Sequence, residues 1–233
     1  MPEKQLQVEL LAHTPDPEKT CALAARTCYS AMEYGELKEL VQEKDQAAFL
    51  RRIVASGHLS VLEHASFTFG VSGVSRALLA QITRHRIASF SVQSQRYVSL
   101  EKGFGYIIPP RIKELGDEAV REFESQMAQM QAWYQGWQDK LGNGEGSNED
   151  ARFVLPNACE THITLTMNAR ELLHFFSLRC CNRAQWEIRG VAEKMLALLA
   201  AQTPELFSFF GPSCRFGPCP EGKMSCGRPR DRI

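Results

Sequence analysis

The sequence predicts an α+β or mixed fold, because segments with two different hydrophobic periods follow one another along the chain. Strict alternation of polar and apolar residues, typical of half-buried strands, occurs over residues 5–11, 66–72 and 161–167. Helical spacing dominates two longer stretches, residues 118–140 and 183–201. With 233 residues, of which 44% are hydrophobic, the chain can bury a substantial core as one large domain or a domain with an insertion.

The first third of the chain predicts one strand and two helices. Residues 5–11 alternate and form the expected strand. An alanine-rich stretch over 18–29, which follows a turn signal, favours a helix. Residues 45–56 place their large apolar side chains on one face and end at Gly57, a common residue just beyond a helix. His58 is therefore expected directly after a helix end.

The middle of the chain continues the same mixture. Residues 66–72 alternate as a strand, and residues 75–82 repeat leucine and isoleucine at helical spacing. A polar loop rich in serine and glutamine is expected to follow that helix. Residues 118–140 predict one long helix with an apolar stripe that serves packing, and the glycine- and asparagine-rich residues 142–148 predict a flexible break.

The last third predicts a short helix over residues 149–154 and a strand over 161–167. Two helices follow, over 168–178 and 183–201. Beyond them, residues 211–233 are rich in glycine, proline and cysteine, and we expect this tail to be irregular or disordered.

The most informative feature is a basic island in an electrically balanced chain. The 27 Lys and Arg residues equal the 27 Asp and Glu residues in number, so the chain has no general attraction for polyanions. Between Glu63 and Glu101, however, there is no acidic residue, while four arginines occur there: Arg76, Arg84, Arg86 and Arg96. Guanidinium groups bind phosphate through paired hydrogen bonds, so the island favours a small phosphorylated ligand such as a nucleotide.

The alternative is that these arginines form a solvated or salt-bridged surface. Two observations favour binding instead. The predicted helix over residues 75–82 would hold the island rigidly, and the polar loop after it is the kind of segment in which binding residues concentrate. In addition, no acidic residue is close in sequence to neutralise the guanidinium groups.

Within the island, Arg84-His85-Arg86 is followed by seven residues and then Ser94, a pattern that resembles the motif of flavin-dependent thymidylate synthases. Further segments resemble that family in the same order along the chain, over about residues 5 to 210: Gly57-His58, Glu63-His64, Phe67-Thr68-Phe69, Ala151-Arg152, Leu155-Pro156, Asn168-Ala169-Arg170, Leu178-Arg179 and Ala184-Gln185-Trp186-Glu187-Ile188. The resemblance implies one family domain over residues 1–210, with a central sheet of antiparallel type, and a separate tail over 211–233.

The resemblance also implies a function. The family methylates dUMP reductively to dTMP, with 5,10-methylenetetrahydrofolate as carbon donor and FAD accepting hydride from NADPH, and without a cysteine nucleophile. Members assemble as homotetramers with shared active sites. We therefore expect an enzyme with dUMP, folate and NADPH as partners, and neither nucleic acid nor membrane among them.

Site residues follow from the resemblance position by position. Arg179 matches the residue that activates the pyrimidine, which makes it the expected catalytic group. The positions that match dUMP ligands are Gln81, Ile82, Thr83, Arg84, Val92, Gln93, Ser94, Gln95, Arg96, Arg152 and Arg179, with Ser94, Arg96 and Arg152 expected at the phosphate. The positions that match FAD ligands are His58, Ser60, Arg84, His85, Arg86, Val92, Asn168, Ala169, Arg170 and His174.

Three of these positions carry open alternatives. Val92 stands where many relatives have an acidic residue, so any contact there must come from the backbone. His174 could instead be a core-facing histidine of an amphipathic helix. Arg179 could instead form a salt bridge with Glu187 or another acid.

Two other classes of function compete with an enzyme. The same arginines would serve a nucleotide-binding regulatory protein without turnover. An RNA-binding domain is less favoured, because the aromatic residues fall at apolar-periodic positions and the net charge is zero. Neither a dinucleotide fingerprint nor a phosphate-binding P-loop occurs in the sequence, so arginine would have to hold any nucleotide.

The eight cysteines divide into two groups. Cys21, Cys28, Cys159 and the pair Cys180-Cys181 lie in periodic segments and are expected to be packed as small hydrophobic residues. Cys214, Cys219 and Cys226 lie in the tail and could bind zinc. Their spacing is not C-x-x-C, however, and a fourth ligand is not evident, so no metal site is predicted.

The sequence contains no run of about 18 apolar residues, and its first residues lack the apolar core of a signal peptide. A cytoplasmic location is expected.

Overall fold

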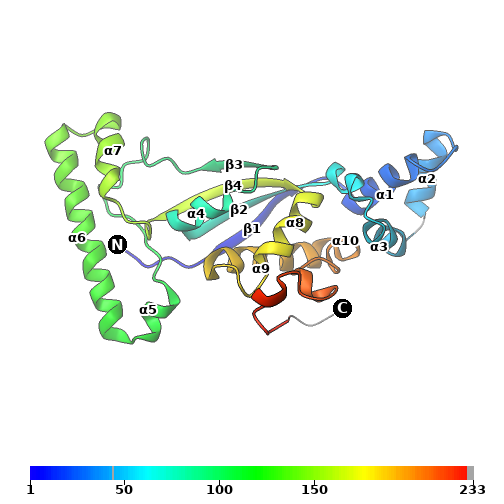
Figure 1. The fold of residues 1–233 in the computed structure, drawn as a ribbon. Coiled ribbons are helices and arrows are strands. Elements are labelled where there is room, and N and C mark those ends of the chain that lie inside the picture. The colour runs from blue at the N-terminus through cyan, green and yellow to red at the C-terminus, as the bar shows by residue number, and fades with distance from the viewer. Residues whose placement is uncertain (44, 230–233) are drawn as a thin grey trace. The chain divides into compact units, whose positions relative to one another are not determined.

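The computed structural model describes residues 1–43 and 45–229. Its four-stranded sheet has the order β1-β2-β4-β3 (Figure 1). The strands are β1 (Gln7–His13), β2 (Ser66–Ser75), β3 (Ala88–Val92) and β4 (Glu160–Asn168). The central pair is in register at Thr68 and Thr166, whose hydroxyl oxygens are 2.9 Å apart. The expected α+β class with an antiparallel sheet is confirmed.

The chain divides into two compact units, and each of the four strands contributes residues to both. The first unit consists of Met1–Gln7, Val71–Arg84 and Phe90–Thr164; the second consists of Val8–Gly70, His85–Ser89 and Leu165–Ile233. The predicted division into a domain over 1–210 and a tail over 211–233 stays a prediction. The described part of the tail belongs to the second unit.

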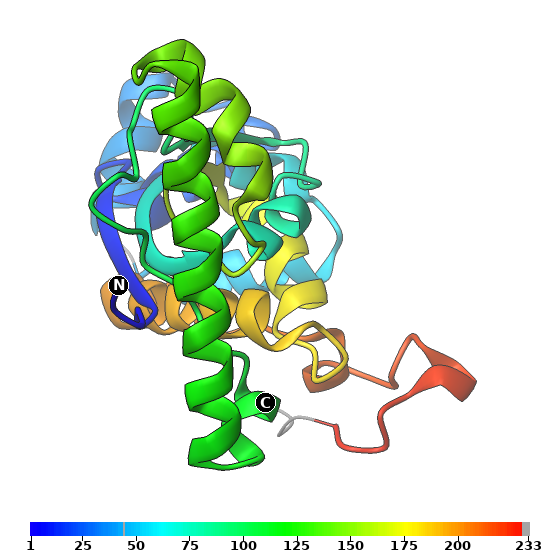
Figure 2. The same ribbon diagram turned by 90° about the vertical axis from the view of Figure 1, so that its left-hand side faces the viewer.

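The first unit is built around one long helix. Figure 2 shows α6 (Asp117–Leu141) with α5 (Pro110–Glu114) at its start and α7 (Glu145–Ala151) at its end. A 3-10 turn, η2 (Arg152–Val154), follows α7, and α4 (Arg76–Ile82) follows β2. The core of this unit is formed by Phe104, Tyr106, Ile108, Met127 and Cys159, each at most 3% exposed.

The second unit contains the remaining helices. Its N-terminal part holds α1 (Pro17–Thr27), α2 (Tyr34–Glu43), α3 (Ala47–Ala55) and the 3-10 helix η1 (Leu59–His64). Its C-terminal part holds α8 (Ala169–Arg179), α9 (Trp186–Gln202), α10 (Pro204–Phe207) and the 3-10 turns η3 (Ser213–Arg215) and η4 (Gly222–Met224). Both views show α9 lying beside β1 (Figures 1 and 2).

Aromatic rings hold the second unit together. Phe67 of β2 packs edge-on against Phe207 of α10 with ring centroids 5.1 Å apart, and Phe207 meets Phe210 at 4.7 Å. Phe175 and Phe176 extend the cluster from α8, and all of these side chains are at most 1% exposed. This core fixes α8 against β2, and α8 is the helix that ends at Arg179.

The end of α3 positions His58 as the sequence predicts. Gly57 has φ +80°, its amide donates to Val54 O, and the amide of His58 donates to Ile53 O. This is the paired hydrogen bonding of a Schellman motif, in which glycine adopts the left-handed conformation without steric cost. His58 thus enters η1 at a fixed place.

Several expectations about local structure are wrong. The segment after Ile82 is not only a polar loop, because residues 88–92 form strand β3 at the edge of the sheet. The expected flexible break at 142–148 is shorter, since α7 already begins at Glu145. Helices α2, α5 and α10 have no counterpart among the predicted elements. Cys28 is exposed rather than packed.

Within the described ranges, no helix is both long enough and apolar enough to cross a membrane.

Candidate active site

A hydrogen-bonded chain of three side chains lies at the end of α8. Arg179 Nε donates to His85 Nε2 at 3.0 Å, and His85 Nδ1 lies 2.9 Å from Glu171 Oε1. His85 and Glu171 are only 5% and 6% exposed. Because Nε2 accepts a hydrogen bond, the imidazole proton must be on Nδ1, from which it donates to the carboxylate of Glu171. The orientation of Arg179 is therefore set by a buried acid through a histidine.

The charge state of His85 follows from its surroundings. Burial lowers the pKa of His85 below its ordinary value of 6.5, and the positive charge of Arg179 lowers it further. The hydrogen bond and charge of Glu171 act in the opposite direction. We conclude that His85 is neutral at pH 7, because only the neutral ring can accept from Arg179 while donating to Glu171.

His174 stands next to this chain. Its ring centroid is 5.9 Å from that of His85, and its side chain is exposed. The alternative of a core-facing histidine is therefore wrong. The ligating atoms of His85, Glu171 and His174 lie within 4.8 Å of one another. Since both ring nitrogens of His85 are engaged and Arg179 adds a positive charge, this group is poorly suited to a cation.

Two guanidinium groups next to His85 in sequence are available to a ligand. Arg84 and Arg86 are both exposed, and within residues 1–43 and 45–229 neither takes part in an ion pair. His85 between them is buried, so the motif alternates between an anchoring side chain and two outward guanidinium groups. Paired donors of this kind suit the phosphates and ring edges of a dinucleotide such as FAD, and these residues fit that cofactor.

The start of α8 carries three more of the positions matched to FAD. Asn168 caps the helix, with Oδ1 accepting from the amide of Glu171 at 2.9 Å. Ala169 is buried, and its amide donates to Ala65 O. Arg170 is exposed and forms an ion pair with Glu63. Of these three, Arg170 has the side chain best placed to meet a ligand, provided that it exchanges its partner.

The other two FAD positions in this unit come from η1 and the residue before it. His58 is half-buried, and its Nδ1 lies 3.3 Å from the hydroxyl of Tyr29. Ser60 is exposed. All the FAD positions except Arg84 and Val92 belong to the second unit.

The positions matched to dUMP belong to the first unit, apart from Arg179. Among them, Arg96 is already engaged: its guanidinium forms ion pairs with Glu145 at 2.7 Å and Glu149 at 3.0 Å. The inference that no acid neutralises the island is therefore wrong for this residue. The two carboxylates are about 50 residues away in sequence, and α7 brings them to Arg96.

The neighbouring positions are held mainly by the backbone. Ser94 Oγ accepts from the amides of Arg96 and Tyr97, and Gln93 donates its amide to His162 O. Arg76, another arginine of the island, donates to Gln93 O at 3.2 Å. Burial lowers the pKa of Arg76, which is consistent with a structural rather than a ligand-binding place.

The remaining dUMP positions differ in how far they can reach a ligand. Gln95 Nε2 donates weakly to the sulfur of Cys159, and Val92 is half-buried at the end of β3. Arg152 donates from Nε to Glu149 O. On α4, Gln81 is half-buried, Thr83 is exposed with its hydroxyl bonded to Leu79 O, and Ile82 is completely buried. Ile82 therefore anchors α4 in the core.

No pattern in the sequence indicated which acidic residues pair with these arginines and with His85. Glu171 pairs with His85, Glu63 with Arg170, and Glu145 and Glu149 with Arg96. Each is distant in sequence from its partner. For Glu171, the one available signal was its place beside Arg170 in a helix start, where an acidic residue is also common for reasons of helix dipole alone.

Comparison with known proteins decides the family. The family model described as thymidylate synthase complementing protein matches residues 9–205. A flavin-dependent thymidylate synthase from Geobacter sulfurreducens is 52% identical over 224 residues, which covers 96% of this chain and 94% of that protein. The chain belongs to the flavin-dependent thymidylate synthase family. A second family member, from Clostridium tetani, is 47% identical over 96% of this chain and 94% of its own length.

Solved structures agree with this membership. Thymidylate Synthase X from Helicobacter pylori, in complex with FAD and dUMP, matches with a TM-score of 0.63 and 25% identity, covering 87% of this chain and 97% of that one. A UMP/dUMP methylase from Streptomyces cacaoi bound to 5-Br dUMP matches with a TM-score of 0.72 and 26% identity, over 90% and 97% of the two chains. This member of the family thus shares its fold with a protein solved with FAD and dUMP, and with another solved with 5-Br dUMP.

Proposed function

We propose that this chain methylates dUMP reductively to dTMP, using 5,10-methylenetetrahydrofolate as the carbon donor, FAD as cofactor and NADPH as the hydride source. Family membership supports the reaction, and the H. pylori relative solved with FAD and dUMP supports both ligands. The observation that carries the proposal in this chain is the fixed guanidinium of Arg179, held by a neutral His85.

Arg179 is the proposed activating residue. A guanidinium aimed at the uracil stabilises the negative charge that develops on the ring when N3 is deprotonated. His85 is a neutral imidazole, so this hydrogen bond orients Arg179 and itself brings no negative charge to the guanidinium group. Orientation before the reaction is what makes such electrostatic stabilisation effective.

The arginines of the motif are the proposed ligands of the cofactor and the nucleotide. Arg84 and Arg86 supply exposed paired donors, and Arg170 and His174 add donors on one face of α8. When bound, FAD would supply the redox chemistry of the reaction, with NADPH as the hydride source. Ser94, Arg96 and Arg152 are the proposed phosphate ligands, and Arg96 must release Glu145 and Glu149 to serve there.

The assembly is part of the proposal. A homotetramer with active sites shared between subunits is supported by family membership, as is the use of NADPH and folate. A cytoplasmic location stays a prediction.

The test is release of tritium from dUMP labelled at C5, because replacement of the C5 hydrogen is required for methylation. Wild-type protein with FAD, NADPH and methylenetetrahydrofolate should release tritium, whereas Arg179→Ala should lose most of that activity. Arg51→Ala, which alters an exposed arginine of α3, is the matched control. A yellow protein that binds dUMP but releases no tritium would favour the regulatory protein without turnover.

A further inference from the structure

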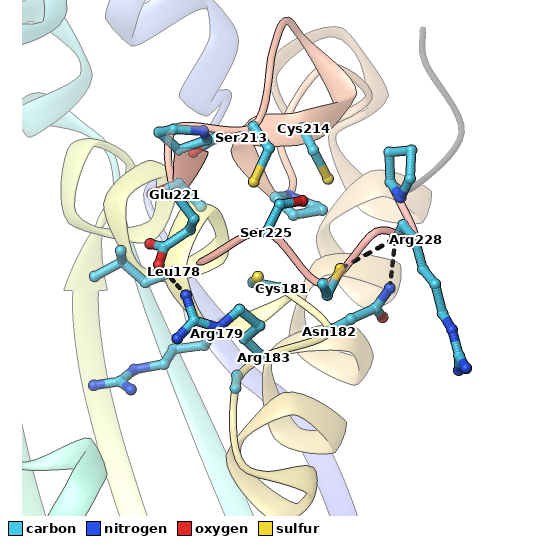
Figure 3. Close-up of a pocket in the computed structure, with 17 residues that line it drawn as sticks. Leu178, Arg179, Cys181, Asn182, Arg183, Ser213, Cys214, Glu221, Ser225 and Arg228 are labelled. Carbon is cyan, nitrogen blue, oxygen red and sulfur yellow. Dashed lines mark hydrogen bonds and ion pairs between the residues drawn. The ribbon is translucent and has the colours of Figure 1, made fainter. Parts of the chain in front are cut away.

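The tail and the end of α8 enclose a pocket of about 280 Å³ in the second unit (Figure 3). One wall is the segment 177–184, which contains Arg179 and the turn after α8. The other wall is the tail, with Pro212–Cys214 at one side and residues 219–229 at the other. This pocket lies where the chain folds back past the proposed activating residue.

Four of the eight cysteines line this one pocket: Cys181, Cys214, Cys219 and Cys226. Figure 3 shows Cys181 coming from the turn after α8 and Cys214 coming from the tail. Cys181, Cys214 and Cys219 are half-buried and Cys226 is exposed, so the four thiols are sheltered yet accessible to a small ion. The sequence offered three thiols without a fourth ligand, and the fold supplies Cys181.

Three of the other cysteines have a different character. Cys21, Cys159 and Cys180 are buried in the core. Burial raises the pKa of Cys21 to about 12 and that of Cys159 to about 11, so these thiols stay protonated. They fit the role of small hydrophobic residues.

Three arginines also line the pocket: Arg179, Arg183 and Arg228. Four thiolates around a divalent ion leave a net negative charge, which these guanidinium groups would offset. The backbone amide of Arg228 donates to Cys226 Sγ at 3.4 Å. Backbone hydrogen bonds to sulfur are among the interactions that support metal-bound thiolates and tune them.

The tail is brought to Cys181 by contacts that involve no metal. Arg183 forms an ion pair with Glu221, and Asn182 Nδ2 donates to Arg228 O at 2.8 Å. The tail itself has two single 3-10 turns and many exposed residues, so it has little core of its own. Short segments with so small a core are commonly held in one conformation by a cross-link such as a bound metal ion.

We propose that Cys181, Cys214, Cys219 and Cys226 form a four-thiolate site for a thiophilic metal centre, either a zinc ion or an iron–sulfur cluster. Thiolate ligands select these metals. Zinc binding releases the thiol protons to solvent and requires no oxidant or reductant. An iron–sulfur cluster would arrive preassembled from a carrier protein and bind by exchange of its thiolate ligands, so that step also involves no net change of oxidation state.

Binding also requires a movement of the tail. Among the described residues, only His85, Glu171 and His174 form a group of three or more potential ligands whose atoms lie within 4.8 Å of one another. No three of the four pocket sulfur atoms are that close together. A metal would draw the tail inward against the segment 177–184. Because Cys181 lies two residues after Arg179, the centre would fix the backbone that carries the proposed activating residue.

The experiment measures the metal content of the whole protein, purified anaerobically without a metal-binding tag. Elemental analysis and acid-labile sulfide distinguish about one zinc ion per chain from about four iron and four sulfide per chain. We expect metal in the wild type and its loss in Cys181→Ser and Cys219→Ser. Cys28→Ser, which removes an exposed thiol of another helix end, should keep its metal.

A second measurement uses only the wild type, so it tests the proposal even if the serine variants fold poorly. In the wild type, titration of the thiols with a mercurial should release metal in step with modification of the pocket cysteines, and mass spectrometry should identify them. Metal-free wild type that also takes up no zinc or reconstituted cluster overturns the proposal, as does full metal content in both serine variants. Disulfides among these cysteines in metal-free protein overturn it as well. Because the readout is metal content, failure here leaves the proposed reaction untouched.

Discussion

Arg179 and His85 are 94 residues apart in sequence, and the structure joins them by a 3.0 Å hydrogen bond from Nε to Nε2. The bond makes the histidine an orienting group for the arginine, and Glu171 holds the histidine in the matching tautomer. Glu171 is therefore a positioning residue, since it acts on Arg179 through His85.

Replacing Glu171 with glutamine should lower kcat by about tenfold, equivalent to about 1.4 kcal/mol of lost transition-state stabilisation. The amide keeps an acceptor but loses the charge that holds the imidazole. The KM for dUMP should change little, because the phosphate contacts are elsewhere. Steady-state tritium release measures both constants. Glu36→Gln, on the exposed face of α2, is the control, and a raised KM with unchanged kcat would contradict the positioning role.

Stability should fall as pH drops below about 6.5, because burial lowers the pKa of His85 in the folded protein. The unfolded chain then binds a proton near its ordinary pKa, whereas the folded chain does not, so acid favours unfolding. The stability that neutral His85 allows is fully present above pH 6.5. It is lost as the pH falls from 6.5 to the lowered pKa of His85 in the folded protein. Urea unfolding from pH 7.5 to 5.5 measures this loss. The loss of unfolding free energy with falling pH should be smaller in His85→Gln than in the wild type. In His64→Gln, which changes an exposed histidine, it should equal that of the wild type. The same pH dependence in all three proteins would contradict the prediction.

Freeing Arg96 should strengthen dUMP binding. The double variant Glu145→Gln, Glu149→Gln removes both carboxylates from its guanidinium. Because these side chains are partly exposed, the expected gain is modest, up to about fivefold in Kd. Calorimetry at low and high salt measures it, and the gain should shrink as salt screens the charges. Weaker binding in the double variant would show that the carboxylates support the site instead of competing for it.

Gly73→Ala should destabilise the protein by about 2 kcal/mol or more. Gly73 has φ +65°, and an added Cβ would lie 1.9 Å from the backbone oxygen of Gln5. Gly35→Ala provides the contrast, because nothing lies within 4 Å of its Cβ position in α2. That variant should be neutral or more stable by up to about 1 kcal/mol. Denaturant unfolding of the two variants compares them, and equal stabilities would contradict the close approach.

Shared active sites predict complementation between inactive variants. Arg179→Ala and Arg96→Ala should each be nearly inactive, and mixing them after partial dissociation should restore part of the activity, because some sites then combine intact residues from different subunits. Tritium release measures the recovery, and light scattering measures the oligomer. A monomer, or a tetramer whose mixtures stay inactive, would contradict shared sites.

The sequence by itself determined the family, the α+β class and most of the long elements. Alternation over 161–167 and helical spacing over 118–140 are local patterns, and the structure has β4 and α6 there. The motif from Arg84 to Ser94 is also a local pattern, so the family could be recognised from it without knowledge of the fold.

Only the tertiary structure decided which side chains meet. Strand β3 was not predicted, because its polar residues are equally typical of a loop. They form a strand only because the segment pairs with β4 at the edge of the sheet. The partners of Arg179, Arg96 and Cys181 come from distant segments, brought together by packing of α7, α8 and the tail. Sequence spacing carries no record of such contacts, because they depend on how whole elements bury their apolar faces.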